Sequence, residues 1–270
     1  MELNRQTRLW IRLCTVILSV VCLILIKDTE VDAASYRAAV NDTVTIPDSQ
    51  SYPNTGSYSW ISYRPAENGY VRVQAQYGSS RYTYSLGYWQ FYAANRKKAL
   101  SADRISYTTK PGTDSFARTT CFAVKKRTTY YLRVQPYDGV KINFSFHKVK
   151  DQSGSRRSKA CSIARSGKYQ GTILSGQKKK DWYRIRQKKT RKINFEIQVK
   201  SDGKFKFTVY NGTGKKLGSM EKGYTAKSAL RVEQKDQSSG HTSGVRAGTY
   251  YLSVEPVDSY SNGYYSVKWK

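Results

Sequence analysis

A nine-residue block of this chain occurs twice. Tyr130–Asp138 reads YYLRVQPYD, and Tyr250–Asp258 reads YYLSVEPVD. Other segments of the first half recur in the second half in the same order: Trp60–Arg64 as Trp182–Arg186, Val71–Ala75 as Ile193–Ile197, Trp89–Tyr92 as Phe207–Tyr210, and Lys97–Lys98 as Lys215–Lys216. Because an ordered repeat of this kind arises when one structural unit is used twice, the sequence predicts two similar domains in tandem.

Apolar and polar residues alternate along these repeated segments. Apolar side chains stand at every second position of residues 193–199, 205–209 and 140–146. Successive side chains of a β-strand point to opposite faces of the sheet, so each segment has one apolar and one polar face. That pattern is typical of antiparallel sheets packed face to face. Turns that contain glycine, among them Asn211–Gly214 and Asn262–Gly263, separate the segments.

No segment after residue 33 has the apolar spacing of an amphipathic helix. We therefore expect an all-β protein with two tandem antiparallel β-sandwich domains. The expected boundaries are residues 34–148 for the first sandwich, 149–170 for a linker and 171–270 for the second sandwich. Each half has about a hundred residues, which is enough for one sandwich.

The N-terminus has the features of an export signal. Three arginines precede an apolar run from Leu13 to Ile26, and Val31–Ala33 offers small residues where a signal peptidase cleaves. Residues 1–33 are therefore predicted to be a signal peptide, so that the mature chain is secreted and has no membrane span. The alternative is an uncleaved membrane anchor, although the run is shorter than the ~20 residues that a spanning helix requires.

Cysteine usage agrees with export. Two of the four cysteines lie in the predicted signal peptide, and the mature chain keeps Cys121 and Cys161. An even pair in an exported chain favours a disulfide, which would tie the linker to the first domain. Two free thiols are the alternative, since spacing alone does not bring two Cα atoms within bonding distance.

The chain is strongly basic. It has 47 Lys and Arg against 19 Asp and Glu, a formal net charge of +28. A surface of this kind attracts anionic polymers with a salt-dependent strength. A solvated basic face without a specific ligand is the alternative. The residues predicted to bind a polyanion lie mainly in runs: Lys97, Lys98, Lys125, Lys126, Arg127, Lys178, Lys179, Lys180, Lys188, Lys189, Arg191, Lys192, Lys215 and Lys216.

Residue types that carry catalysis are scarce. His147 falls on the polar face of a predicted strand and His241 in a Ser/Gly loop, and neither has zinc-ligand spacing. No nucleophile elbow is present, and the acidic residues are isolated. We therefore expect no catalytic residue, no cofactor and no metal. Calcium is the alternative, since four aspartates lie near predicted turns, although none lies in an EF-hand-like loop: Asp48, Asp181, Asp202 and Asp258.

Four segments resemble the bacterial pre-peptidase C-terminal domain: Asp181–Ile185, Phe207–Asn211, Ala247–Val254 and Gly263–Val267. The resemblance covers residues 171–270 well and residues 55–148 more loosely. The first half departs from it, since Ser59 stands where the second half has Asp181. The resemblance implies a jelly-roll-like β-sandwich that is secreted, non-catalytic and usually attached to an exported hydrolase. Some members of that family bind extracellular polymers such as collagen, with calcium near the start of the domain.

These features predict a secreted, non-catalytic binding module, monomeric and extracellular or associated with the cell surface. The expected partner is an anionic cell-wall polymer, a polysaccharide or extracellular matrix, and no dedicated nucleic acid. Two copies acting together on a repeating polymer would raise avidity. The alternatives are a protein-binding adhesin or accessory module, and an unrecognised wall hydrolase.

Overall fold

The computed structural model describes residues 32–46, 58–77, 86–101, 105–108, 118–135, 140–235 and 242–270. These residues form β-strands and a single-turn 3-10 helix, η1 (Arg157–Lys159). The predicted signal peptide lies outside the described residues, apart from Asp32 and Ala33 at the start of β1. In the described ranges, no helix has the length and apolar character needed to cross a membrane.

The first sandwich packs a five-stranded sheet on a four-stranded sheet. The five strands lie in the order β1 (Asp32–Ala38), β3 (Tyr58–Tyr63), β8 (Tyr130–Gln135), β5 (Leu86–Tyr92) and β6 (Ile105–Thr108). The four strands lie in the order β2 (Asp42–Ile46), β9 (Val140–Lys148), β4 (Gly69–Tyr77) and β7 (Arg118–Val124). Phe91 of one sheet stacks on Phe122 of the other with ring centroids 4.2 Å apart, so the apolar faces meet in one core.

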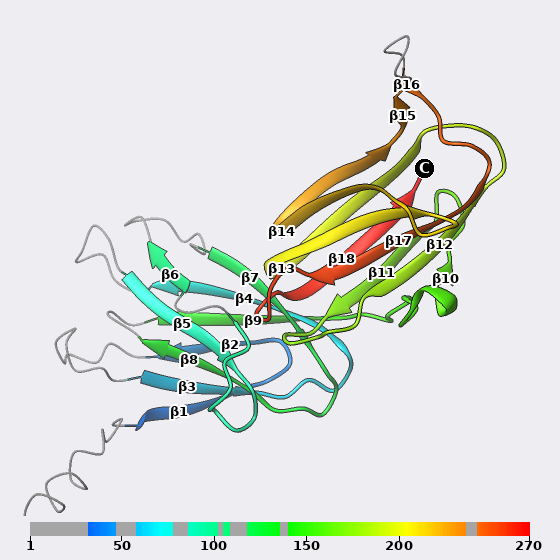
Figure 1. Ribbon diagram of the computed structural model, residues 1–270. Helices are drawn as coiled ribbons and strands as arrows, with labels where there is room; N and C mark the ends of the chain where they lie inside the picture. The colour runs from blue at the N-terminus through cyan, green and yellow to red at the C-terminus, as the bar shows by residue number, and fades with distance from the viewer. Residues whose placement is uncertain are drawn as a thin grey trace, which may run out of the picture.

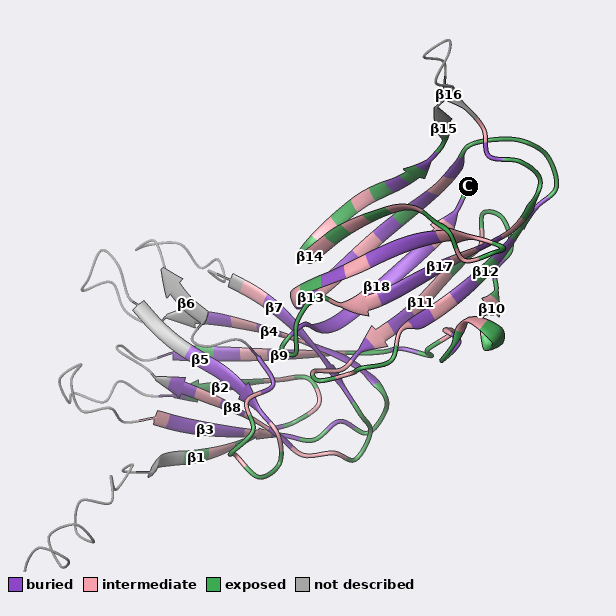
Figure 2. Ribbon diagram, in the orientation of Figure 1, coloured by how far each residue is buried: buried purple, intermediate pink, exposed green. Residues whose placement is uncertain are grey.

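The second sandwich follows the same plan. Its hydrogen-bonded order is β10 (Cys161–Ser162), β12 (Asp181–Gln187), β17 (Gly248–Pro256), β13 (Ile193–Asn211), β18 (Asn262–Trp269) and β11 (Lys168–Ile173), with β14 (Lys216–Val232) beside β13. A short hairpin of β15 (Gln234–Lys235) and β16 (Thr242–Ser243) lies apart from this sheet. Figure 1 shows the second domain beside the first, and Figure 2 shows buried residues alternating with exposed ones along its strands.

Strand β13 belongs to both layers of the second sandwich. Its first part, Phe195 to Asp202, pairs with β18, and its last part, Phe205 to Asn211, pairs with β17. Between them Gly203 has a φ of +85°, a left-handed conformation that favours glycine, and the pairing with β14 shifts register there. Residues 193–199 and 205–209, which look like separate strands in the sequence, are therefore one bent strand.

The strand registers confirm two tandem sandwiches of one design. Trp60 of β3 lies opposite Arg133 of β8, and the matching Trp182 of β12 lies opposite Ser253 of β17. The first domain uses β4 and β5 where the second uses the two parts of β13. Most pairs are antiparallel as expected, but the edge strands β1 and β10 pair in parallel with β3 and β12.

The segment expected to be a linker is built into the second sandwich. It contains η1 and β10, and Gly154 exchanges backbone hydrogen bonds with Trp182 at 3.0 and 2.8 Å. Asn262 and Gly263, which the sequence places in a turn, begin β18 instead. Gly263 has a φ of +146°, and an added Cβ would meet the backbone of Ser201 at 2.5 Å. Glycine thus permits close strand packing there rather than a turn.

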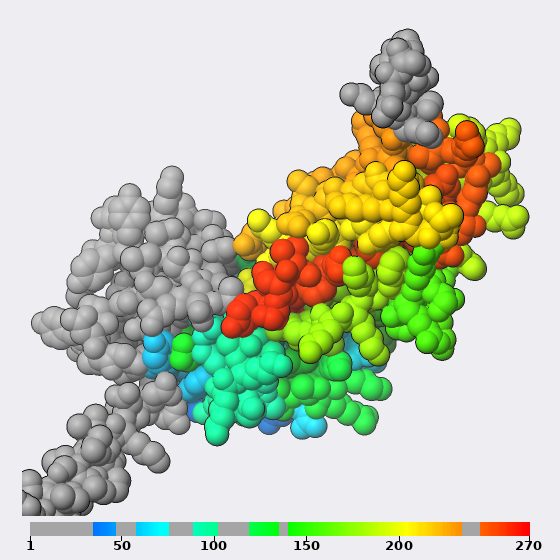
Figure 3. Space-filling model, in the orientation of Figure 1, coloured from blue at the N-terminus to red at the C-terminus, as the bar shows by residue number. Residues whose placement is uncertain are grey.

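The two sandwiches are in contact. Tyr70, Cys121, Val149 and Tyr264 form a buried cluster separate from the two cores. In this cluster, Tyr70 and Cys121 come from the first sandwich and Tyr264 from the second. Figure 3 shows the C-terminal strands, in red, lying against the first domain.

Candidate anion-binding groove

The strand β12 presents two arginines on the outer face of the second sandwich. Tyr183 and Ile185 are buried in the core, whereas Arg184 and Arg186 between and after them are exposed. This alternation follows from the period of two along a strand. The guanidinium groups of Arg184 and Arg186 therefore project from the same face.

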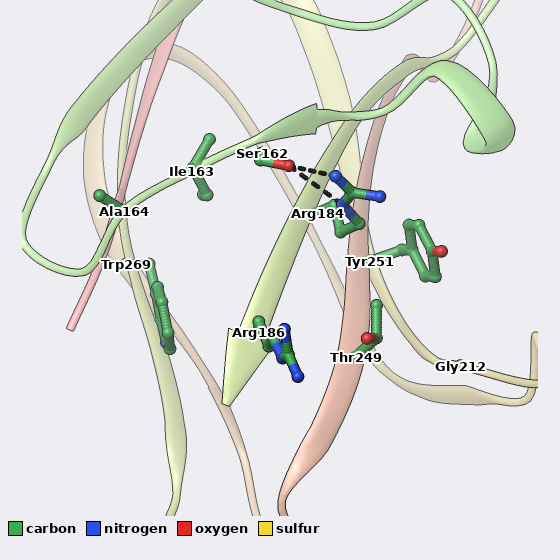
Figure 4. Close-up of a pocket in the computed structure, with 9 residues that line it drawn as sticks. All are labelled: Ser162, Ile163, Ala164, Arg184, Arg186, Gly212, Thr249, Tyr251 and Trp269. Carbon is green, nitrogen blue, oxygen red and sulfur yellow. Dashed lines mark hydrogen bonds between the residues drawn. The ribbon is translucent and has the colours of Figure 1, made fainter. Parts of the chain in front are cut away.

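Strand β17, the neighbour of β12 in the sheet, adds side chains to the same face. Tyr251 lies opposite Arg184 in the register, and Thr249 lies opposite Arg186. A groove of about 620 Å³ opens on this face. Its lining, drawn in Figure 4, is Ser162, Ile163, Ala164, Arg184, Arg186, Gly212, Thr249, Tyr251 and Trp269.

The two arginines differ in how they are held. Nε and Nη2 of Arg184 both donate to the Ser162 hydroxyl, at 3.0 and 2.6 Å. That contact fixes the guanidinium plane, and Figure 4 shows it beside Tyr251. The side chain of Arg186 has no hydrogen-bond or ion-pair partner within the described ranges. The groove thus combines one oriented cation with one uncommitted cation.

Two further arginines flank the groove through aromatic contacts. Arg157 of η1 lies over the Tyr251 ring, with its guanidinium carbon 4.6 Å from the ring centroid. Its Nη2 also donates to the carbonyls of Asn211, at 3.2 Å, and Gly212. Arg165 lies 5.6 Å from the centroid of the Trp269 ring. Cation–π contacts of this kind place positive charge at the rim without neutralising it.

The groove suits an anion. None of its nine lining residues is acidic, while two are arginines. A guanidinium matches phosphate, sulfate and carboxylate oxygens with paired hydrogen bonds. Tyr251 and Trp269 add aromatic surface beside these donors, and aromatic rings pack on the apolar faces of sugars. The buried indole N–H of Trp269, which is 6% exposed, has no hydrogen-bond partner among the described residues.

In the first domain too an arginine lies over the matching tyrosine, but this arginine comes from a different segment. Arg96 lies 4.4 Å from the Tyr131 ring centroid, and Tyr131 occupies the position that Tyr251 has in the repeat. Arg96 follows β5, whereas Arg157 comes from η1. The position matching Arg96 in the second domain is Gly214, where an added Cβ would lie 2.7 Å from Nη1 of Arg157. The glycine therefore leaves space for the replacing arginine.

None of the fourteen basic residues predicted to bind a polyanion lines this groove. Thirteen are exposed and Lys180 is half-buried. Lys180 forms an ion pair with Glu255 at 2.9 Å, and Lys192 forms one with Glu233 at 2.8 Å. The prediction was based on runs of basic residues and did not include Arg184 and Arg186. The pattern that could have identified these two arginines is their alternation with core residues along one strand.

The predicted disulfide is not formed, and both thiols are free. Cys121 lies on β7 in the buried contact between the domains. Cys161 lies on β10, paired with Tyr183 of β12, at the edge of the second sandwich. The two cysteines belong to different surroundings because the expected linker is part of the second sandwich. Burial raises the pKa of Cys121 to about 12.

No group of three or more His, Cys, Asp or Glu side chains that could hold a metal occurs in the described part of the chain. Asp48 and His241 lie outside that part. Asp202 is buried, and Asp258 caps its own turn by accepting the N–H groups of Tyr260 and Ser261 at 2.9 and 2.7 Å.

Asp181 occupies a buried site of its own. Its Oδ2 accepts the Tyr265 hydroxyl at 2.7 Å, and its Oδ1 accepts the Gln177 amide at 3.3 Å. Burial, followed by the charge of Asp151, raises its pKa to about 7 although these hydrogen bonds act in the opposite direction. The Tyr265 hydroxyl also contacts that of Tyr183 at 3.0 Å, so a buried polar chain crosses the core.

No family model and no curated protein matches the chain. Among solved structures it is similar to the pre-peptidase C-terminal domain of a collagenase from Bacillus anthracis, at 12% identity and a TM-score of 0.30, over 46% of this chain and 100% of that one. That domain belongs to the family that the sequence resembles. The chain is also similar to the CUB1-EGF-CUB2 domains of rat MASP-1, at 10% identity and a TM-score of 0.27, over 87% of this chain and 100% of that one. A third match is the CBM22-1-CBM22-2 tandem domain of Xyn10C from Paenibacillus barcinonensis, at 8% identity and a TM-score of 0.23, over 78% and 82%.

Proposed function

We propose that this protein is a secreted, non-catalytic binding module that holds an anionic polymer outside the cell, with the groove around Arg184 and Arg186 as its main contact. The observation that carries the proposal is the groove itself. Two guanidinium groups project into it, two more flank it, and no carboxylate lines it. A polymer of phosphate-, sulfate- or carboxylate-bearing units supplies the matching groups.

The charge of the whole chain supports the same partner. A formal net charge of +28 raises the local concentration of polyanions and speeds their association. The groove then gives orientation that dispersed lysines do not, because an arginine pair binds oxyanions with defined geometry. The basic runs, including Lys188–Lys189 and Lys215–Lys216, act as a weaker and less specific attraction around it.

A panel of immobilised polymers tests the class of partner. Purified wall teichoic acid, a sulfated polysaccharide, a neutral glucan and a set of matrix proteins are presented to the protein across a salt series, while release of soluble fragments is monitored. We expect binding to the two anionic polymers that weakens steeply as salt rises, and no binding to the neutral glucan. Salt-insensitive binding to one matrix protein would favour an adhesin, and fragment release would show an enzyme.

A further inference from the structure

A second pocket lies where the two sandwiches meet. It has a volume of about 260 Å³, and both domains contribute to it. The first sandwich and the residue after it provide Tyr70, His147, Lys148 and Val149. The second provides Lys168, Gln170, Gln198, Lys200 and Tyr264. No residue of this pocket lines the groove around Arg184 and Arg186.

Stacked rings form a rigid wall of the pocket. Tyr70 stacks on His147 with ring centroids 4.7 Å apart, and its other neighbour, Tyr264 of the second sandwich, is 5.0 Å away. Tyr70 is buried, and its hydroxyl accepts a hydrogen bond from Nζ of Lys200 at 3.1 Å. The Lys200 amine is thereby held in the pocket rather than extended into solvent.

The charge of the pocket is not balanced. Its lining includes His147, Lys148, Lys168 and Lys200 but no acidic residue. Lys148 pairs with Glu67 at 3.0 Å on the exposed side. Among the described residues, Lys168 and Lys200 have no carboxylate partner. Burial and then the charges of Lys200 and Arg72 lower the pKa of His147. The positive charges near the ring therefore add to burial in disfavouring the protonated imidazole.

We propose that this interdomain pocket binds a phosphate-type oxyanion, either free phosphate or a phosphate group of a polymer. Lys168 and Lys200 neutralise the anion, and the side-chain amides of Gln170 and Gln198 supply neutral donors. The anion would contact both sandwiches, because His147 and Lys148 come from β9 and Lys200 comes from β13. Occupancy therefore stabilises the contact between the domains. The site uses none of the groove residues and stands without the proposed function.

The test uses His147 as the reporter. The chain has only two histidines, so a His147→Gln variant assigns the His147 ring signal in the NMR spectrum. Inorganic phosphate is titrated at constant ionic strength. We expect a saturable shift of the His147 signal. In a Lys168→Gln/Lys200→Gln variant the apparent affinity should fall about tenfold or more. A Lys141→Gln/Lys159→Gln variant has the same charge change at two exposed lysines outside the pocket, and it should bind as the unmodified protein does.

The site is refuted if chloride produces the same shift as phosphate, if the signal does not saturate, or if the two double variants bind equally. Because Lys200 contacts a buried tyrosine, Lys168→Gln alone is also measured, since Lys168 is exposed and its loss leaves the fold intact. A short glycerol phosphate oligomer separates the two sources of the anion. Tighter binding of the oligomer than of inorganic phosphate identifies a polymer, and equal or weaker binding identifies free phosphate.

Discussion

The side-chain oxygen of Asn262 accepts a hydrogen bond from the backbone N–H of Ala123 at 2.7 Å, across the junction between the two sandwiches. Both residues are 1% exposed. The bond joins the start of β18 to the end of β7, beside the buried side chains of Cys121 and Tyr264. A directional bond in a buried contact fixes the two domains relative to each other more strictly than apolar burial alone.

Replacing this amide should weaken the contact. Asn262→Ala leaves the Ala123 N–H buried without a partner, which costs about 1–3 kcal/mol. Unfolding in urea should show the loss. The matched control is Asn143→Ala, which removes an amide that donates to the Thr43 hydroxyl at 3.0 Å on the exposed surface of the first sandwich. Equal losses in the two variants would contradict a special role for the junction.

Asp181 should make stability depend on pH. Its folded pKa of about 7 lies above its ordinary value of 3.8, so the folded protein retains a proton that the unfolded chain has released. The stabilising contribution is complete below pH 4 and is lost as pH rises to 7, by about 4 kcal/mol in total.

The variant Asp181→Asn isolates this effect. Asparagine cannot ionise, and its oxygen still accepts from Tyr265. The free energy of unfolding of the unmodified protein minus that of the variant reports on Asp181 alone, because the other charged groups contribute equally to both proteins. This difference should fall between pH 4 and pH 7. A difference that stays constant with pH would show that Asp181 ionises in the folded protein as it does in water.

Glycine at position 171 should be required for the stability of the second sandwich. A Cβ at this position of β11 would contact the hydroxyl of Tyr265, which is fully buried and donates to Asp181. Gly171→Ala should therefore destabilise the second sandwich by about 1–3 kcal/mol. Gly218→Ala on β14 is the control, because its Cβ would find Val232 at 3.4 Å, a nearly ordinary contact. Thermal unfolding of both variants makes the comparison, and a Gly171 variant as stable as the control would refute the packing argument.

The two thiols should react differently. A thiol reagent should label the partly exposed Cys161 in the folded protein and spare Cys121, whose burial raises its pKa to about 12 and keeps it as the thiol. After denaturation without reductant, both should be labelled. Absence of labelling in the denatured sample would demonstrate a disulfide and overturn this arrangement.

The repeat and the alternating pattern were sufficient to predict the fold class. The sequence predicts strands at Trp182–Arg186 and Tyr250–Val254 because each strand buries one face, and burial of one face produces a period of two in the sequence. Strand β14 was not readable, since only Leu230 and Val232 near its end are buried. The bend of β13 could not be predicted either. It depends on the pairing of β13 with two different strands, β17 and β18, and these pairings are not visible in the local sequence.

The groove and the junction could be predicted only in part. The net charge predicts an anionic partner. The runs of lysine placed the predicted contact in exposed turns, whereas Arg184 and Arg186 are single basic residues that alternate with core positions of one strand. Tyr70 and Tyr264 resemble ordinary strand tyrosines. Their role follows from which outer faces of the two sandwiches touch, and that arrangement is set by tertiary contacts between β7, β13 and β18.

The most direct test compares two double variants of equal charge for their binding of an anionic polymer. Arg184→Gln/Arg186→Gln removes the groove cations, and Lys188→Gln/Lys189→Gln removes two exposed cations that follow the same strand. At one fixed salt concentration, calorimetric titration with the tightest-binding polymer of the panel gives the Kd for each. We expect the arginine variant to bind about tenfold more weakly or worse, since charge-assisted hydrogen bonds contribute about 1.5–3 kcal/mol each. The lysine variant should show only the small loss that two dispersed charges produce. Equal weakening of both variants would mean that bulk charge, and not the groove, holds the polymer.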